Sequence, residues 1–393
     1  MPKVLRIINR FNLGGPTYNA AYLTRYLPDN YETLLVGGHH SSSEEDSFHI
    51  TDQLGIQPIT LPEMKRDISL NSVSKAFRKI VKLIEWFKPD IVHTHASKAG
   101  ALGRLAAWKN NVPVIVHTFH GNVFHSYFNK VKTGAYIKIE KELANRSNAV
   151  IAISPLQKKE LVNTFKIADN DKVKVIPLGF DLERFQFNTE KKRENFRKLY
   201  DIDHDVVAIG IIGRLVSIKN HSLFLSVAKK VLEKTGVRTR FLIIGDGELK
   251  NELILEGEKK GLSIKKSKND NAPLQFTSWI KNIDEAIAGL DIIVLTSKNE
   301  GTPVSLIEAQ AGARAIITTD VGGIKDIILP GKSGLISASE DEESMVQNLL
   351  KLIENNELRK NMGLAGNNFV KNRFTYTRLA YDMDKLYCEL LDA

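Results

Sequence analysis

The sequence lacks the features on which several common kinds of protein depend. Its 393 residues include a single cysteine, Cys388. One cysteine excludes an internal disulfide framework and any zinc site that needs several cysteines, and it favours a cytosolic location. No run of 18 apolar residues occurs, so no transmembrane helix is predicted. Residues Met1–Asn9 contain an apolar run that is too short for a signal sequence and is interrupted by Arg6, and we expect a first strand there.

Two nucleotide-binding motifs are also missing. Gly331-Lys332-Ser333 looks like the end of a P-loop, but Asp326 stands where that motif requires its first glycine, and a strand is predicted to follow. No clean G-x-G-x-x-G follows the first strand, which argues against a dinucleotide-dependent oxidoreductase. His93 and His95 have the spacing of two metal ligands on one strand face, yet no cysteine or third histidine joins them, so no metal site is predicted.

The excess positive charge is confined to the first half of the chain. The formal net charge is +9; residues 1–178 contain 24 basic and 15 acidic residues, whereas the remainder contains 31 of each. A basic half is consistent with an anionic partner such as a membrane surface, a pyrophosphate-bearing substrate or a nucleic acid. Scattered surface lysines that serve only solubility would explain the same numbers.

Both halves alternate predicted strands with predicted helices. Apolar runs predict strands at 4–9, 33–36, 90–94, 112–117, 149–153 and 172–176, and then at 206–212, 241–244, 274–277, 291–296 and 315–319. Residues 72–87 have an amphipathic helical pattern, which fits a membrane surface but is more commonly caused by packing on a sheet. The length and the alternation predict an α/β protein with two Rossmann-like domains, each a doubly wound parallel sheet that binds ligands beyond the carboxyl ends of its strands.

The stretch Ser297–Ala309 is where the candidate site begins. Thr302 and Pro303 predict the N-cap and the first residue of a helix after the strand at 291–296. The amides of Val304 and Ser305 then have no partner within the helix and suit a phosphate or another anionic oxygen.

Two carboxylates flank this helix start, Glu300 in the loop and Glu308 inside the helix. A carboxylate accepts paired hydrogen bonds, which suits vicinal sugar or ribose hydroxyls. On spacing alone, Glu308 is equally consistent with an ordinary exposed helical glutamate.

Further candidates follow other predicted strands. Gly213-Arg214-Leu215 with Lys219 offers two cations for a diphosphate, or merely a solvated loop. Gly245-Asp246-Gly247 allows a tight turn beside a ligand. Gly14-Gly15 either presents bare amides to phosphate oxygens or only turns the chain. His120 follows a strand and precedes a glycine, a position that favours a functional role over a structural one, whereas His117 still lies within the strand pattern.

Together and in order, these motifs resemble the retaining glycosyltransferases of the GT-B fold, specifically family 4, which includes bacterial surface-polysaccharide enzymes. The resemblance covers nearly the whole chain. It is carried by Gly213-Arg-Leu with Lys219-Asn220, Phe241–Glu248, Glu300–Ala309, Val175–Phe185, Ser97–Arg104, His117–Gly121 and the glycines Gly322, Gly323, Gly331 and Gly334.

The resemblance implies a role for each half. Residues 1–178 would bind the acceptor, 179–205 would be a linker, and 206–374 would bind a nucleotide-sugar donor, with a final helix in 375–393 packing back on the first domain. Arg214 and Lys219 would neutralise the departing diphosphate, Glu308 would hold the ribose, and Glu300 would orient the donor sugar.

The resemblance also implies how the remaining candidates act. Donor contacts would include Gly14, Gly15, Gly213, Gly245, Gly301, Thr302, Pro303, Val304 and Ser305, with His120 near the reacting carbon. Front-face transfer would retain the anomeric configuration without a metal or other cofactor, and no Asp-x-Asp motif is found near the cleft; Asp201-Ile-Asp203 lies in the linker. Thr302-Pro303 and Asp326 depart from the residues that many relatives have at these positions.

The predicted reaction is transfer of a hexose or N-acetylhexosamine from a nucleotide sugar, UDP-linked by family habit, to a saccharide acceptor. The acceptor is expected to be lipid-linked, at the inner face of the cell membrane, in surface-glycan assembly, with peripheral binding to anionic membrane and no nucleic-acid partner. Residues Phe124–Lys130 with Lys132 either contact this acceptor or cover the cleft. Two alternatives stay open: a nucleotide-sugar epimerase of the same fold, and a non-catalytic binder of anionic polymers that has no need of Glu300.

Overall fold

The computed structural model describes residues 1–393 except 13, 40–46, 65–69, 122–129 and 268–269. The chain forms two compact units. The first unit contains Met1–Phe180 and Phe374–Ala393, and the second contains Asp181–Arg373. Of the segment 179–205, which was predicted to be a linker, residues 181–205 belong to the second unit.

The first unit is built on a parallel sheet of seven strands. The order is β3-β2-β1-β4-β5-β6-β7, and every neighbouring pair is parallel. The six strands predicted in this half are confirmed, and β3 is an additional short one. Their bounds are β1 Lys3–Arg10, β2 Glu32–Gly38, β3 Ile59–Thr60, β4 Ile91–His95, β5 Val114–Phe119, β6 Ala149–Ala152 and β7 Val173–Val175.

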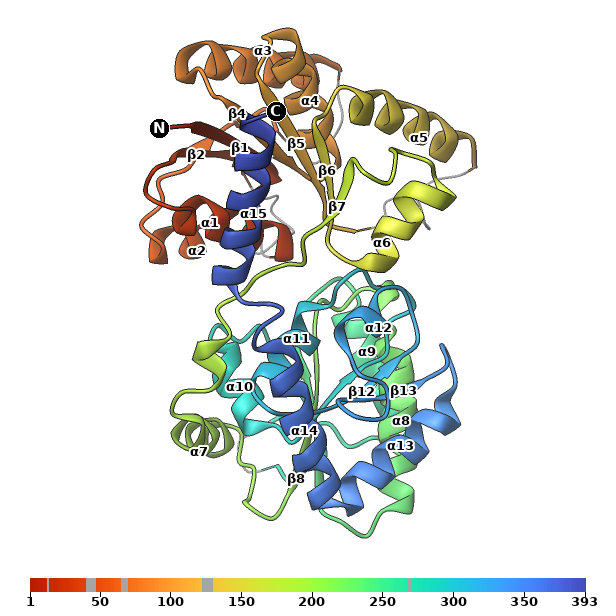
Figure 1. Ribbon diagram of the computed structural model, residues 1–393. Helices are drawn as coiled ribbons and strands as arrows, with labels where there is room; N and C mark the ends of the chain where they lie inside the picture. Colours follow the sequence, from red (N-terminus) through yellow and green to blue (C-terminus); the bar gives the residue numbers. More distant parts are fainter. Residues whose placement is uncertain (13, 40–46, 65–69, 122–129, 268–269) are drawn as a thin grey trace. The chain divides into compact units, whose positions relative to one another are not determined.

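Helices cover both faces of this sheet (Figure 1). Helices α3 (Leu70–Phe87), α4 (Ser97–Lys109) and α5 (Lys130–Asn145) pack on the face that carries Val92, Ile115 and Val150. Helices α1 (Gly15–Tyr26) and α15 (Tyr376–Leu391) pack on the opposite face. The shorter elements are α2 (Phe48–Gln53), α6 (Pro155–Lys159) and a π-helical turn, Glu160–Thr164. The apolar stripe of α3 is buried against the sheet, so the core interpretation of its pattern is confirmed.

Helix α15 is fixed to the first unit by a buried polar chain as well as by apolar packing. Arg6 in β1 donates to the Tyr387 hydroxyl over 3.3 Å and to Thr24 over 3.0 Å. Because arginine only donates, the Tyr387 hydroxyl gives its own proton to His93 Nδ1, 2.6 Å away. Neutral His93 then carries its proton on Nε2 and donates to the Thr118 hydroxyl over 2.8 Å.

The second unit contains a parallel sheet of six strands in the order β10-β9-β8-β11-β12-β13. The strands are β8 Val207–Ile212, β9 Thr239–Ile244, β10 Leu274–Ser278, β11 Ile292–Leu295, β12 Ala315–Thr319 and β13 Leu335–Ser337. The helices are α7 Thr189–Leu199, α8 His221–Lys234, α9 Lys250–Lys259, α10 Ile283–Gly289, α11 Val304–Ala311, α12 Ile324–Ile327, α13 Glu342–Glu354 and α14 Asn356–Val370, with 3-10 turns at Glu183–Phe185 and Ser217–Lys219. Two doubly wound parallel sheets are therefore present, as predicted.

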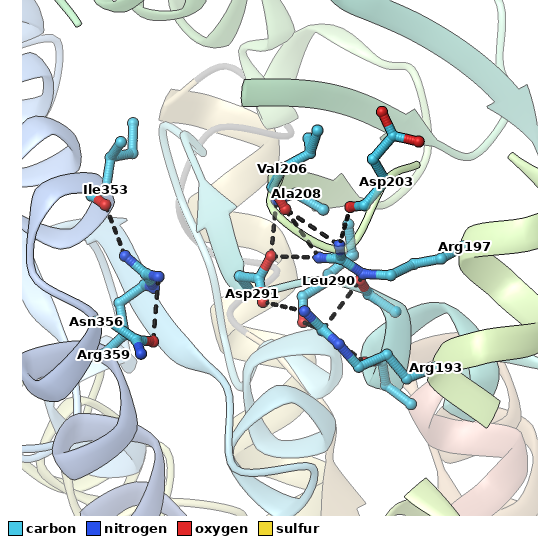
Figure 2. Close-up of polar contacts among 12 residues, drawn as sticks. Arg193, Arg197, Asp203, Val206, Ala208, Leu290, Asp291, Ile353, Asn356 and Arg359 are labelled. Atoms are coloured by element: carbon cyan, nitrogen blue, oxygen red, sulfur yellow. Dashed lines mark hydrogen bonds and ion pairs between the residues drawn. The ribbon is translucent and has the colours of Figure 1, made fainter. Parts of the chain in front are cut away.

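Helix α7 joins the second unit through two arginines on its inner side (Figure 2). Arg193 and Arg197 donate to the two carboxylate oxygens of Asp291 over 2.7 and 2.6 Å, and Asp291 also accepts the Ala208 amide over 2.8 Å. Arg197 is 2% exposed and also donates to the Val206 carbonyl. These two charged residues of the predicted linker segment 179–205 thus anchor α7 at the amino ends of β8 and β11.

Candidate active site

In the second unit, the order of the strands changes direction between β8 and β11. The chain adds β9 and β10 on one side of β8, and β11, β12 and β13 on the other. Ligands of doubly wound sheets bind at such a switch point, beyond the carboxyl ends of the strands. The loops that follow β8 and β11 are joined there, because the Thr296 hydroxyl donates to the Lys219 and Asn220 carbonyls over 3.0 and 2.9 Å.

An ion pair between Lys219 and Glu300 lies at this switch point. Lys219 Nζ is 2.6 Å from Glu300 Oε1, and the Ser297 hydroxyl donates to the same oxygen over 2.6 Å. The two side chains are 21% and 11% exposed, so the pair is shielded yet reachable. The sequence singled out both residues but not their contact. Arg214, the other predicted cation, is exposed and makes no side-chain hydrogen bond or ion pair with any residue that the structure describes.

Glycines allow the loops around this pair to approach closely. Gly322 has φ +52°, and a Cβ there would lie 1.8 Å from the Glu300 carbonyl oxygen. The neighbouring Gly323 amide donates to that same carbonyl over 3.1 Å. Between β8 and β9, a Cβ on Gly245 would lie 2.0 Å from the Gly213 carbonyl oxygen. Gly213 and Gly245 thus shape the loops by allowing close backbone contact.

Helix α11 begins one residue later than the sequence predicts. Pro303 is the N-cap, with φ −70° and ψ 111°, and the helix starts at Val304. Proline fixes φ but leaves ψ extended here, so the expected Thr302 cap does not form. The Thr302 hydroxyl is buried without a hydrogen-bond partner among the described residues. Val304 and Ser305 are the first two helical residues, whose amides have no acceptor within the helix.

Glu308 lies in α11 with only part of its side chain in contact with solvent. Burial raises the pKa of its carboxyl to about 7, an effect that Arg184 opposes and Asp284 reinforces. A carboxyl with this pKa changes its protonation state near neutral pH. This environment differs from that of an exposed helical glutamate, the alternative that the spacing left open.

Comparison with known proteins identifies the family. Residues 13–184 match the family model described as Glycosyltransferase Family 4, and residues 192–369 match that of the Glycosyl transferases group 1. The chain is 30% identical over 335 residues to a capsular polysaccharide biosynthesis glycosyltransferase of Staphylococcus aureus, covering 82% of this chain and 83% of that one. The chain belongs to glycosyltransferase family 4.

Other similar proteins agree with this assignment. The family 4 chain is 29% identical over 350 residues to the Escherichia coli UDP-Gal:alpha-D-GlcNAc-diphosphoundecaprenol alpha-1,3-galactosyltransferase, covering 88% of each. Its fold matches that of HepE of Anabaena, solved in complex with UDP, with a TM-score of 0.81 over 98% of this chain and 100% of that one at 16% identity. A Rickettsia africae glycosyltransferase matches with a TM-score of 0.78, 20% identity, and coverage of 99% and 98%. The predicted GT-B fold is confirmed.

In the first unit of this glycosyltransferase, His120 is the first residue after β5. Its Nε2 lies 2.9 Å from Nδ1 of His95, at the end of β4. Burial lowers the pKa of His120 to about 3, so the ring is neutral at physiological pH. His117 is fully buried in β5 and bonds to the Thr94 hydroxyl over 2.8 Å, which is a structural role. Because His95 and His120 are separated by 25 residues, the sequence did not show that they form a pair.

The first unit also has a switch point, between β1 and β4. Asn9 at the end of β1 accepts the Ala99 amide of α4 over 2.6 Å, which ties the two loops together. Gly14 is the N-cap of α1, and Gly15 is its first residue. Ala96 has φ +64°, a strained conformation for a residue with a Cβ, and such strain tends to gather at functional sites. No sequence pattern singled out Asn9 or Ala96 as a site residue.

The remaining predictions concern the acceptor segment, a metal site and a membrane-spanning helix. The segment Phe124–Lys130 lies outside them except for Lys130. Among the residues that the structure describes, no group of three or more His, Cys, Asp or Glu side chains is placed to hold a metal ion. No helix in the described part of the chain is long and apolar enough to cross a bilayer.

Proposed function

We propose that this family 4 member is a retaining glycosyltransferase that transfers a hexose or N-acetylhexosamine from a UDP-sugar to a lipid-linked saccharide. The observation that carries the proposal is the Lys219–Glu300 pair at the switch point of the second unit, beside the free amides of α11. The UDP-Gal-dependent activity of the Escherichia coli relative and the UDP bound to HepE support a UDP-sugar donor. The capsular relative supports a role in surface polysaccharide synthesis.

The polar groups of the second unit suit the parts of such a donor. Arg214 and Lys219 are cations that stabilise the negative charge of the leaving diphosphate, which is greatest in the transition state. The Val304 and Ser305 amides at the start of α11 add hydrogen-bond donors, whose partial positive charge also attracts the diphosphate. Because Glu300 Oε1 is occupied by Lys219 and Ser297, its second oxygen is the one offered to sugar hydroxyls.

Glu308 and His120 complete the proposed assignment. An ionised Glu308 accepts hydrogen bonds from the two ribose hydroxyls. A neutral His120, whose pKa burial lowers to about 3, donates or accepts a hydrogen bond at the donor sugar without adding charge near the oxocarbenium-like reacting carbon. We propose that these groups act without a resident metal, and treatment with a chelator such as EDTA should then leave turnover unchanged.

The test is a donor screen that compares the wild type with Glu300→Gln. Purified protein is mixed with a panel of nucleotide sugars, and free nucleotide release is measured. Glu343→Gln is the matched control, because Glu343 is also a lysine-paired glutamate but lies on α13. We expect release from one donor, lost in Glu300→Gln and kept in Glu343→Gln. NMR of the glycosylated product then reports whether the anomeric configuration is retained.

The alternatives give different results in the same screen. An epimerase would interconvert donor sugars without an acceptor. If no donor is hydrolysed and none raises the melting temperature, the assignment of the donor site is wrong, and binding to anionic polymers becomes the function to test.

A further inference from the structure

The outer face of the α3–α4–α5 layer exposes large apolar side chains. Trp86 on α3 is 68% exposed, Leu105 and Trp108 on α4 are 38% and 49% exposed, and Ile139 on α5 is 53% exposed. These residues point away from a core that the opposite sides of the same helices already complete. Because exposed tryptophans are costly in water and are enriched at membrane interfaces, two of them on one helical layer need an explanation.

The three helices lie on the same face of the sheet of the first unit (Figure 1). Helix α4 lies between α3 and α5 and packs on both. A fully buried ion pair, Arg104 with Glu140 at 2.5 Å, fixes α4 to α5. On the outside of the same junction, the Arg146 guanidinium stacks 3.9 Å above the Trp108 ring. The apolar groups are therefore held on a rigid platform.

Positive charge surrounds these apolar groups. Lys75, Arg78 and Lys82 are exposed on α3 and lie on the same side of the helix as Trp86, which they precede by eleven, eight and four residues. Lys109 on α4 and Lys138 on α5 are also exposed. The exposed acids among the described side chains of the three helices are Glu85 and Glu142, and Glu142 is already paired with Arg146.

The opposite face of the same unit has another character. The outward side of α15 carries Asp382, Asp384 and Glu389 beside Lys385. Within residues 1–178, residues 70–146 contain 13 basic and 4 acidic residues, whereas the others contain 11 of each. The excess charge of the first half therefore falls on the segment that contains α3, α4 and α5, not evenly along the chain as it would if it served only solubility.

We infer that the outer face of α3, α4 and α5 binds an anionic lipid bilayer. Tryptophan rings settle at the level of the headgroups, and lysines and arginines are drawn to the negative surface potential. Nucleic acid would explain the basic residues but leaves Leu105 and Ile139 in water, so a lipid surface fits the whole set better.

This orientation suits the acceptor, and in this respect the inference rests on the proposed function. Helices of the layer would lie parallel to the membrane, and one helix is about 10 Å thick. The carboxyl ends of β1, β4 and β5, with Gly14, His95 and His120, would then be separated from the lipid surface by about one helix diameter. A diphosphate headgroup with its saccharide can span a gap of that size while its lipid stays in the bilayer.

Vesicle binding with the full-length protein tests the inference. Neutral vesicles are compared with vesicles that contain one third anionic lipid, for the wild type and for the triple variant Lys75→Gln, Arg78→Gln, Lys82→Gln. Each removed charge should weaken binding to anionic vesicles about fivefold, so the triple variant should lose on the order of 100-fold. The matched control removes three exposed lysines of the second unit, Lys281→Gln, Lys351→Gln and Lys360→Gln, and should bind like the wild type.

Tryptophan fluorescence locates the contact. The chain has three tryptophans, Trp86, Trp108 and Trp279, and replacing two at a time with Phe gives three single-tryptophan proteins. Brominated anionic lipid should quench Trp86 and Trp108 but not Trp279, which lies in the second unit.

Two results would overturn the inference: unquenched Trp86 and Trp108, or equal binding by the triple and control variants. A third result would also reject the lipid inference. If the protein binds heparin or nucleic acid but not vesicles, and the triple variant loses that binding, the face binds another polyanion. Nucleotide release in the vesicle-free donor screen is unaffected by these variants, so a failure here is distinct from a failure of the proposed reaction.

Discussion

Mild acid should unfold the first unit well before the second. His93, His95 and His117 are fully buried in adjacent strands of the first unit. Burial, reinforced by nearby cationic groups such as Arg6 and Arg104, lowers the pKa of all three rings well below the usual value. They therefore stay neutral in the folded state while the unfolded chain takes up protons near pH 6.5.

The magnitude follows from linkage between protonation and folding. Stability is fully present above the unfolded pKa and is lost as the pH falls below it. Between pH 7.5 and 5.5, each histidine that binds a proton only when unfolded lowers the free energy of unfolding by about 1.4 kcal/mol. Three such histidines lower it by about 4 kcal/mol, and His120 in the same unit, whose pKa burial lowers to about 3, lowers it by about 1.4 kcal/mol more. The total of about 5.5 kcal/mol is a large part of the 5–15 kcal/mol typical of a domain.

The second unit should change little over the same range. Burial lowers the pKa of His221 to about 4, so this residue lowers the free energy of unfolding by about 1.4 kcal/mol in the same way. Burial raises the pKa of Glu308 to about 7, so at pH 5.5 its carboxyl is protonated in the folded state, which raises the free energy of unfolding by about 1.8 kcal/mol. Acids with lowered pKa values, such as Asp246, release their protons below this range and do not contribute. The effects of His221 and Glu308 on the free energy of unfolding of the second unit therefore nearly cancel.

Hydrogen exchange resolved by mass spectrometry measures each unit separately. Amides of β4 and β5 should lose about 5.5 kcal/mol of protection free energy between pH 7.5 and 5.5, whereas amides of β8 and β11 should lose less than about 1 kcal/mol. His117→Gln is the internal check. It should reduce by one the number of protons that the first unit takes up on unfolding, and so make the free energy of unfolding depend less steeply on pH, even if the variant is less stable at every pH. Parallel changes in both units, or a slope unaltered by His117→Gln, would refute the reasoning.

Three further predictions concern single residues. Tyr387→Phe leaves Arg6 and His93 without their shared partner and should destabilise the first unit by about 1–3 kcal/mol in urea unfolding, whereas the exposed Tyr381→Phe should have no effect. Gly322→Ala places a Cβ against the Glu300 carbonyl at a positive φ and should lower stability by at least about 1 kcal/mol and weaken donor binding in calorimetry; an unchanged melting temperature would contradict this. Donor affinity should rise about tenfold from pH 6 to pH 8 as Glu308 ionises, and Glu308→Gln should make it independent of pH; an equal rise in the variant would assign the effect elsewhere.

The sequence was sufficient where one physical signal dominates. Strands such as β8 and β11 are continuous apolar runs because both faces of a parallel sheet are buried, and that pattern is visible without any contact information. The glycines and charged residues that follow those strands in the sequence lie at the carboxyl edge of the second sheet, because each directly follows the end of a strand.

The sequence was insufficient where a residue's role depends on a distant partner. Arg193 and Arg197 look like solvated linker charges until Asp291, more than 90 residues away, is seen to bind both. Thr302 was expected to cap α11, but the ψ angle of Pro303 decided otherwise. The His95–His120 contact has the same character, since no local pattern distinguishes it from two separate histidines.

The division of the first unit into Met1–Phe180 and Phe374–Ala393 has a consequence for synthesis on the ribosome. Every strand of the sheet on which α15 packs has been synthesised once residue 180 has been made. The α15 residues that cover it, Leu379, Met383 and Tyr387, are synthesised only after the second unit. At 5–20 residues per second, the second unit is translated in the intervening roughly 10–40 s. During that time the nascent first unit presents an apolar face that α1 covers only in part, and Arg6 lacks its contact with Tyr387. The second unit can fold as soon as it emerges, so the order of maturation is the reverse of the order of translation.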